Sequence, residues 1–214
     1  MMGRAKGLKG LIRRGYALLF AFVFIFYIGM SVIPAVMMSN GKDGAAKIIY
    51  RGFHFLCHQY PWRSWFLKGE QPYYPLTASE GSTKLTFADA SGLNMNEVDA
   101  RSFYGTSRMG YKMAICQRDT AIYGAMAIFA LIFFLSRNQI RCIHWKYWLI
   151  FGVLPIGLDG GTQLLSQLIP VIPFRESTPL LRTVTGALFG FFLCWFLLPK
   201  LEASLREGEK DDLQ

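Results

Sequence analysis

Residues 16–38 read YALLFAFVFIFYIGMSVIPAVMM and contain no charged side chain. The hydrocarbon core of a bilayer is about 30 Å thick, so an α-helix needs about 20 apolar residues to cross it. A buried helix of a soluble protein would show a polar face with a period of about 3.6 residues, and this stretch shows none. The apolar core of a cleaved signal peptide is only about 7–15 residues long. We therefore expect a membrane-spanning helix here.

Three further stretches are long and apolar enough to span a bilayer: residues 113–135, 147–172 and 179–199. The composition agrees, because hydrophobic residues make up 52% of the 214 positions and charged residues only 17%, against about 25% charged in a soluble domain. This excludes an ordinary soluble enzyme and a disordered chain. The sequence predicts an all-α integral membrane protein, a four-helix bundle.

The positions of the basic residues predict the orientation of the bundle. Lysine and arginine precede the first stretch at five positions, without an acidic residue: Arg4, Lys6, Lys9, Arg13 and Arg14. The short loop between the second and third stretches is basic as well, with Arg137, Arg141 and Lys146. Cytoplasmic loops carry such an excess, so we predict that both termini are cytoplasmic. The net charge of +9 then reflects attraction to anionic lipid, and nothing resembles a nucleic-acid-binding module.

The polar segments complete the predicted domain organisation. We expect a basic N-terminus at residues 1–15, a membrane domain at 16–199 and a polar cytoplasmic tail at 200–214. Residues 45–59 are expected to form a short amphipathic helix on the outer side. A long exoplasmic loop rich in Gly, Pro, Ser and Thr is expected at about 68–112, with one short helix at about 94–103. Loops of this length are usually functional or disordered.

Ionisable and amide side chains interrupt the apolar stretches in the outer half of the expected bundle. An ionisable group in a membrane costs at least about 2–3 kcal/mol, so each needs a partner or a water-filled cavity. We predict a polar pocket formed by Arg118, Asp159, Gln163, Arg175, Glu176 and Arg182. A purely structural network, with Arg118 paired to Asp159 and Arg182 to Glu176, would meet the same cost. Gly186 and Gly190 have the spacing that lets helix backbones approach closely.

A second cluster combines thiol, imidazole and carboxyl groups. Cys57 and His58 end the amphipathic segment, and Cys116 and Asp119 lie three residues apart at the start of the second apolar stretch. Zn²⁺ binds four ligands drawn from Cys, His and carboxylate, and two close pairs can supply them. A disulfide between Cys57 and Cys116, or two inert buried thiols, fits the same residues.

Four motifs follow one another along the chain. They are CHQ at 57–59 with RS at 63–64, CQRDTAIY at 116–123, DGGTQ at 159–163, and REST at 175–178 with an arginine at 182 and TG at 185–186. With these motifs the chain resembles, from residue 57 to 199, the prokaryotic membrane proteins catalogued as domain of unknown function 2085. The resemblance implies a multi-pass protein of the prokaryotic cytoplasmic membrane. It also implies a metal site at Cys57, His58 and Cys116, but no established reaction.

The chain departs from the pattern of that family at several positions. Asp119 stands where the family has a second cysteine, Ala121 where it has glycine, and Pro179 where it has asparagine. A carboxylate can replace a thiolate but is a harder ligand, which makes the set less typical of zinc. The segment 68–112 is longer than the usual link in the family and resembles an insertion.

Two functions from different classes follow from the sequence. The first is an accessory or structural subunit of a larger membrane complex, which would contact other subunits through aromatic residues of the 68–112 segment: Tyr73, Tyr74, Phe87, Phe103 and Tyr104. The alternative is a membrane-embedded metalloprotein, with zinc as the expected ion. It would act as an enzyme or as a lipid or ion handler through the outward-facing pocket. Four helices without an inverted repeat disfavour a transporter.

Overall fold

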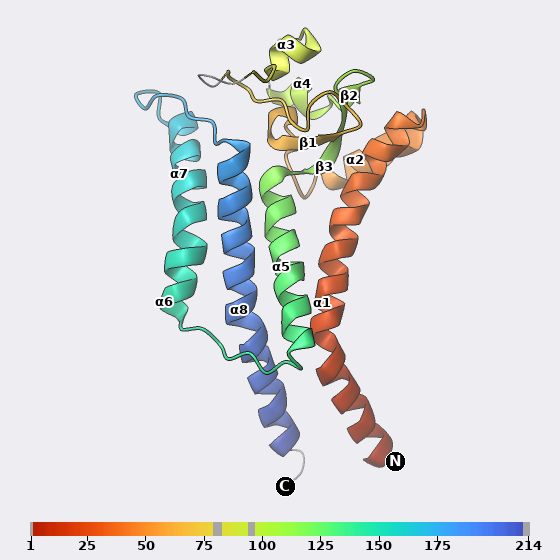
Figure 1. Ribbon diagram of the computed structural model, residues 1–214, viewed down its shortest axis with the longest axis vertical. Coiled ribbons are helices and arrows are strands. Elements are labelled where there is room, and N and C mark those ends of the chain that lie inside the picture. The colour runs from red at the N-terminus through yellow and green to blue at the C-terminus, as the bar shows by residue number, and fades with distance from the viewer. Residues whose placement is uncertain (1, 79–82, 94–96, 212–214) are drawn as a thin grey trace.

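A computed structural model describes residues 2–78, 83–93 and 97–211, and the chain is mostly helical (Figure 1). Four of its helices are long and apolar enough to cross a membrane: Gly15–Ser39, Gln117–Leu135, Trp145–Leu168 and Pro179–Gly208. Large hydrophobic side chains are exposed along them, as a lipid-facing surface requires. The prediction of four apolar helices is therefore confirmed.

The four spans lie side by side in a row (Figure 1). Three of them belong to α1 (Met2–Ser39), α5 (Gln117–Leu135) and α8 (Pro179–Asp211). The span Trp145–Leu168 consists of the short α6 (Trp145–Tyr147), a π-helical turn (Trp148–Val153) and α7 (Leu154–Leu168). Helix α1 packs on α5, α5 packs on α8, and α8 packs on α7. The two termini lie at the same end of this row, opposite the β-sheet (Figure 1).

Helices α5 and α8 make the closest contact because α8 presents glycines to α5. A Cβ atom on Gly190 would lie 2.2 Å from the carbonyl oxygen of Ile122, and one on Gly186 would lie 2.7 Å from that of Arg118. Only residues without a side chain allow the backbones to approach so closely. Towards the termini, Phe129 of α5 packs edge-to-face against Phe191 of α8, with ring centroids 5.2 Å apart.

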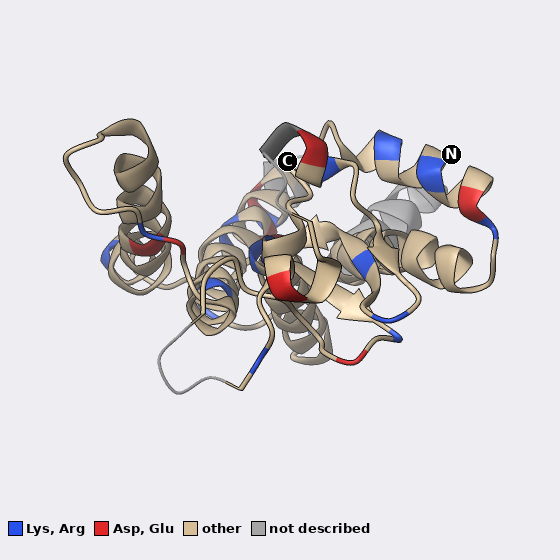
Figure 2. Cartoon of the chain, turned by 90° about the horizontal axis from the view of Figure 1, so that it is seen from above, with Lys and Arg blue, Asp and Glu red and all other residues tan. Residues whose placement is uncertain are grey.

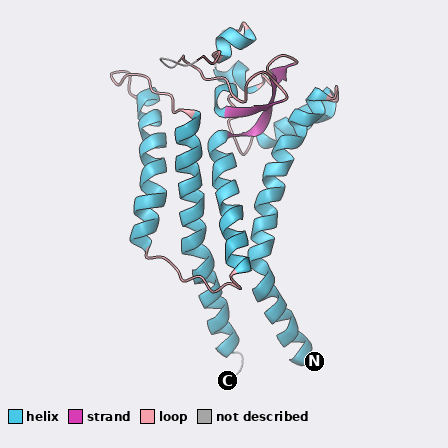
Figure 3. Ribbon diagram, viewed as in Figure 1, coloured by secondary structure: helices cyan, strands magenta, loops and turns pink. Residues whose placement is uncertain are grey.

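A small antiparallel sheet stands at the other end, which we call the sheet end (Figure 3). Its strands β1 (Ser64–Leu67), β2 (Gly105–Thr106) and β3 (Gly110–Cys116) are arranged in the order β1-β3-β2. The all-α prediction missed this sheet. Residues 113–116, which we assigned to the second membrane helix, extend β3 because Ser64 pairs with Cys116 and Phe66 with Lys112. Helix α5 therefore begins only at residue 117.

The amphipathic outer helix is shorter than predicted. Helix α2 (Asp43–Phe53) ends before the cysteine–histidine motif, so Cys57 and His58 lie in the connection that leads to a 3₁₀ turn at Pro61–Arg63. At the terminal end, residues 200–211 continue α8 as a helix, where the sequence suggested a separate polar tail.

The 68–112 segment is a folded unit and not simply a surface loop. It contains α3 (Phe87–Ser91) and α4 (Glu97–Arg101), and it shares a buried cluster with the residues just before it: Trp62, Phe66, Tyr74, Phe87, Ala100 and Met109. Residues 97–101 of the short helix predicted at 94–103 are helical, and 94–96 lie outside the described residues. Seen from the sheet end, charged residues of both signs are scattered over the visible elements (Figure 2).

A fully buried lysine joins this segment to α2 and to the connection that follows α2. Lys112 Nζ donates hydrogen bonds to the carbonyl oxygens of Gln59, at 2.5 Å, and Arg101, at 2.9 Å. The carbonyl oxygen of Lys112 accepts a hydrogen bond of 2.5 Å from Tyr50 Oη of α2. Burial lowers the pKa of Lys112 to about 7, because the interior disfavours its charged form.

Candidate functional site

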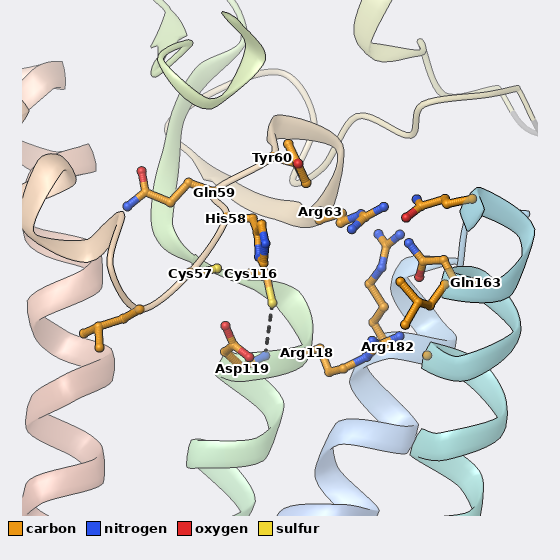
Figure 4. Close-up of a pocket in the computed structure, with 14 residues that line it drawn as sticks. Cys57, His58, Gln59, Tyr60, Arg63, Cys116, Arg118, Asp119, Gln163 and Arg182 are labelled. Atoms are coloured by element: carbon orange, nitrogen blue, oxygen red, sulfur yellow. Dashed lines mark hydrogen bonds between the residues drawn. The ribbon is translucent and has the colours of Figure 1, made fainter. Parts of the chain in front are cut away.

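A cavity of about 340 Å³ lies at the sheet end, and all four sequence motifs contribute to its walls or supports (Figure 4). One wall comes from the connection after α2 and from the start of α5, and another from α7 and α8. Each predicted metal ligand lines this cavity, as do Arg118, Gln163 and Arg182 of the predicted polar pocket. Asp159, Arg175 and Glu176 lie behind the cavity wall. The two carboxylates bind the arginines of the wall, and Arg175 binds Asp159.

The first wall brings together two thiols and a carboxyl group. Ligand atoms of Cys57, Cys116 and Asp119 all lie within 4.8 Å of one another. Cys116 caps the N-terminus of α5, where its Sγ accepts a hydrogen bond of 3.4 Å from the backbone N–H of Asp119. Both cysteines are free thiols, so the disulfide considered above is not formed. His58 lines the cavity outside this group and stacks on Tyr60, with ring centroids 5.7 Å apart.

The backbone next to Cys57 is fixed by the following glutamine. Gln59 is buried in a left-handed conformation, with φ of 57°, that few residues other than glycine adopt. Its side-chain Nε2 donates a hydrogen bond of 2.8 Å to the carbonyl oxygen of Tyr50, and its own carbonyl oxygen accepts from Lys112. These bonds tie the connection to α2 and β3 and so hold Cys57 opposite Cys116.

The two thiols are electrostatically unequal. A hydrogen bond from Cys116 lowers the pKa of Cys57, because it stabilises the Cys57 thiolate. The same hydrogen bond, together with burial, raises the pKa of Cys116 well above its usual value. The first proton to leave this pair is therefore that of Cys57, and a thiolate is the form that binds metals.

Asp159 of α7 anchors part of the second wall. Its carboxylate accepts hydrogen bonds from Arg118 at 2.6 Å, from Arg175 at 3.0 Å, and from Ser177 Oγ at 2.7 Å. Its side chain is only 4% exposed. Gly160 follows it, and a Cβ atom there would lie 3.1 Å from Arg118 Nη1, so this glycine leaves space for the guanidinium.

Glu176 holds the remaining arginines. Arg63 binds it with both ends of its guanidinium fork, at 2.7 and 2.8 Å, and Arg182 forms a further ion pair with it. Gln163 Nε2 donates to the same carboxylate at 3.0 Å. The two ion pairs considered from the sequence, of Arg118 with Asp159 and of Arg182 with Glu176, are thus both formed. They form part of the cavity wall, so the structural network and the pocket coexist.

The sequence prediction missed two members of this network. Arg63 was quoted only as part of a motif, yet it reaches Glu176 from the turn before β1. Gln117 is fully buried, donates a hydrogen bond of 3.1 Å to the carbonyl oxygen of Ser64, and accepts one of 3.3 Å from Arg182. Only the motif that contains Arg63 signalled its importance, since the contact spans more than 100 residues.

The aromatic residues expected to contact a partner are largely used within the chain. Tyr74 is 1% exposed and Phe87 is 3% exposed, both in the core of the folded 68–112 segment. Phe103 packs edge-to-face on Phe87, and Tyr104 stacks on Tyr50 of α2. Tyr73 is half-buried against Trp65. These contacts remove the main observation on which the accessory-subunit prediction depended.

Comparison with known proteins agrees with the resemblance inferred from the motifs. The family described as "Predicted membrane protein", domain of unknown function 2085, matches residues 98–196. A protein of Methanocaldococcus jannaschii, described as uncharacterized, is 24% identical over 193 residues, which cover 88% of this chain and 93% of the relative. No solved structure was found to match the chain.

Proposed function

We propose that this chain is a multi-pass membrane metalloprotein that binds a transition-metal ion, with zinc expected, through Cys57, Cys116 and Asp119. The observation that carries the proposal is the approach of their three ligand atoms to within 4.8 Å of one another. Thiolate and carboxylate oxygen are both accepted zinc ligands, and their bonds to the ion of about 2.0–2.3 Å are compatible with this spacing.

The surroundings of the three ligands support a site with an accessible metal. Zinc in catalytic sites has three protein ligands and keeps a further position for water or substrate, where it acts as a Lewis acid. Here the ligands lie in the wall of an open cavity and not inside a closed core. The side chain of His58 lines the same cavity and is a candidate for an additional ligand or a proton acceptor. This supports metal-dependent chemistry on a molecule held in the cavity.

Metal analysis of the purified full-length protein tests the proposal. We expect about one zinc ion per chain, lost in Cys57→Ala and Cys116→Ala and weakened in Asp119→Asn. The variants Cys142→Ala and Cys194→Ala are the matched controls, because these cysteines lie outside the cavity and should leave the metal content unchanged. Unmutated protein without stoichiometric metal would refute the proposal. So would a thiol titration that finds Cys57 and Cys116 joined in a disulfide.

We also propose that the membrane is the prokaryotic cytoplasmic membrane, with the sheet end outside and both termini in the cytoplasm. The basic residues that precede the first span lie at the terminal end, as the positive-inside rule requires. Reporters fused to the C-terminus test the orientation. A fluorescent protein that folds only in the cytoplasm should be active there, and a phosphatase that needs export should be inactive. The reverse result would refute it.

A role as a subunit of a larger membrane complex is the second candidate. It is favoured by one observation: the folded 68–112 segment extends beyond the ends of the helices (Figure 1), where it is accessible to a partner. Migration of the protein in a native gel in mild detergent tests this role. A single small species from native membranes, unchanged by shortening this segment, would refute it.

A further inference from the structure

Three arginines from different elements line one side of the cavity, and we call Arg63, Arg118 and Arg182 the arginine wall. Together with Arg175 behind it, this wall has more positive charge than its carboxylates neutralise. Four guanidinium groups, those of Arg63, Arg118, Arg175 and Arg182, share two carboxylates. Each carboxylate already binds two of them, so two positive charges remain. The carboxylate of Asp119, which also lines the cavity, offsets one of these charges. The cluster as a whole therefore keeps a surplus of one positive charge, although Arg175 lies behind the cavity wall and its side chain is 38% exposed.

Arg118 is only partly satisfied by hydrogen bonds to the residues that the structure describes. Its Nη2 binds Asp159, but its Nε is buried and has no hydrogen-bond partner among the described residues. Buried donors without a partner are uncommon, and this one shows that the described protein groups do not fully satisfy the guanidinium. The side chain of Arg118 is 22% exposed and lines the cavity, so the part that can contact a molecule there is its exposed part and not the buried Nε. The side chain is held in this position by Asp159 and by the space beside Gly160. The guanidinium is thus preorganised for an anionic acceptor within the cavity.

From this charge surplus and this incompletely paired guanidinium we propose that the cavity binds a phosphate group, with Arg118 as its principal donor. The planar guanidinium fork matches the oxygen geometry of phosphate, and Arg63 and Arg182 add positive charge on the same wall. The binding of phosphate uses the arginine wall and does not require the metal proposed above. If the metal is present, the phosphate would lie between the two walls.

The phosphate can belong to a lipid or to a soluble molecule. Leu56 and Leu164 line the same cavity and are 65% and 55% exposed, so apolar surface adjoins the charged wall. Leu164 belongs to a membrane span. The head group of a phosphomonoester lipid, with its acyl chains along these leucines, would satisfy both surfaces. Free phosphate would satisfy only the arginines.

Binding measurements on the full-length protein in detergent distinguish these sources. The probes are inorganic phosphate, short-chain phosphatidic acid and short-chain phosphatidylcholine, titrated calorimetrically. We expect phosphatidic acid to bind more tightly than phosphatidylcholine. Binding of inorganic phosphate as well would show that the phosphate group suffices. Binding of inorganic phosphate alone would assign the site to a soluble ligand. Failure of both inorganic phosphate and phosphatidic acid to bind would overturn the proposal.

Variants show whether binding occurs at the arginine wall. Arg118→Lys keeps the charge but removes the planar guanidinium fork, and we expect binding about tenfold weaker, as for loss of one charge-assisted hydrogen bond. Gly160→Ala should have a similar effect, because its methyl group would press on Arg118. Arg108→Gln is the matched control, since Arg108 pairs with Glu70 in solvent outside the cavity. Equal affinities in all three variants and the unmutated protein would overturn the proposal.

The same titrations on Cys57→Ala separate this proposal from the metal site. Phosphate binding that persists without metal supports the arginine site by itself, whatever the metal analysis shows. Phosphate binding that is lost in Cys57→Ala while the fold is retained would overturn the claim that the arginine wall suffices. Circular dichroism and the thermal unfolding midpoint establish that each variant is folded.

Discussion

Replacement of the buried Lys112 by methionine should change how stability depends on pH. Burial lowers the pKa of Lys112 from its ordinary value near 10.5 to about 7, so between these values the unfolded chain holds a proton that the folded chain has released. Stability rises with pH wherever the unfolded state binds more protons. The folded protein should therefore become more stable as the pH rises from about 7 to about 10. Below pH 7 both states are protonated and this contribution is constant.

The magnitude follows from the difference between the two pKa values. Each pKa unit corresponds to about 1.4 kcal/mol, so the full difference is worth about 5 kcal/mol. No discount for solvent is needed, because the side chain of Lys112 is fully buried, where it donates to two backbone carbonyl oxygens and lies 5.7 Å from the centre of the Tyr104 ring. Methionine has a similar length and no proton to release, so Lys112→Met should lack this dependence. The variant also loses two hydrogen bonds, which lowers its stability at every pH.

Thermal unfolding in mild detergent at a series of pH values from 6 to 10 provides the assay. The relevant quantity is the difference between the pH dependences of the two proteins, since tyrosines and thiols titrate in both. The matched control is Lys47→Met, which alters an exposed lysine of α2 and should leave the slope unchanged. Parallel curves for Lys112→Met and the unmutated protein would refute the reasoning and indicate that Lys112 stays protonated in the fold.

Two further predictions concern the packing of the helices and are read from the midpoint of unfolding in detergent. Asp159→Asn should lower the free energy of unfolding by about 3 kcal/mol, because it leaves two arginines without their shared carboxylate. Glu70→Gln, which breaks an exposed pair, should cost less than about 1 kcal/mol, and equal losses would contradict this account. Gly190→Ala should cost about 1–3 kcal/mol, because its methyl group would collide with the carbonyl oxygen of Ile122. Gly157→Ala, with nothing within 4 Å, should be neutral, and an equally mild Gly190→Ala would show that α5 and α8 separate easily.

The membrane helices were predictable because each is specified by a local property. A run of about 20 apolar residues needs no information from the rest of the chain. The boundary at residue 117 was not predictable in this way, since Met113, Ala114 and Ile115 are as apolar as the helix that follows. Their strand conformation comes from pairing with β1, about 50 residues earlier in the chain. The sequence of the apolar stretch 113–135 alone does not indicate that its first residues pair with β1.

The candidate site was predictable where several ionisable residues had to share one membrane depth. That requirement placed Arg118 near Asp159 and Arg182 near Glu176, because the cost of isolated charge in a membrane is high. It gave no reason to include Arg63, which lies outside the apolar stretches and reaches the network through the fold of the outer segment. The grouping of Cys57 with Cys116 was predicted from two close pairs of ligand residues, and only the structure provides its geometry.

Strand β3 continues directly into α5, and this limits where related sequences can gain or lose residues. Cys116 is at once the last residue of the strand and the cap of the helix, so no flexible residue separates the two. Successive residues of a strand point to opposite faces, and a shift of β3 by a single position against β1 would turn this thiol away from Cys57. Relatives should therefore tolerate insertions and deletions between the strands, but none within them, even where every cavity residue is retained.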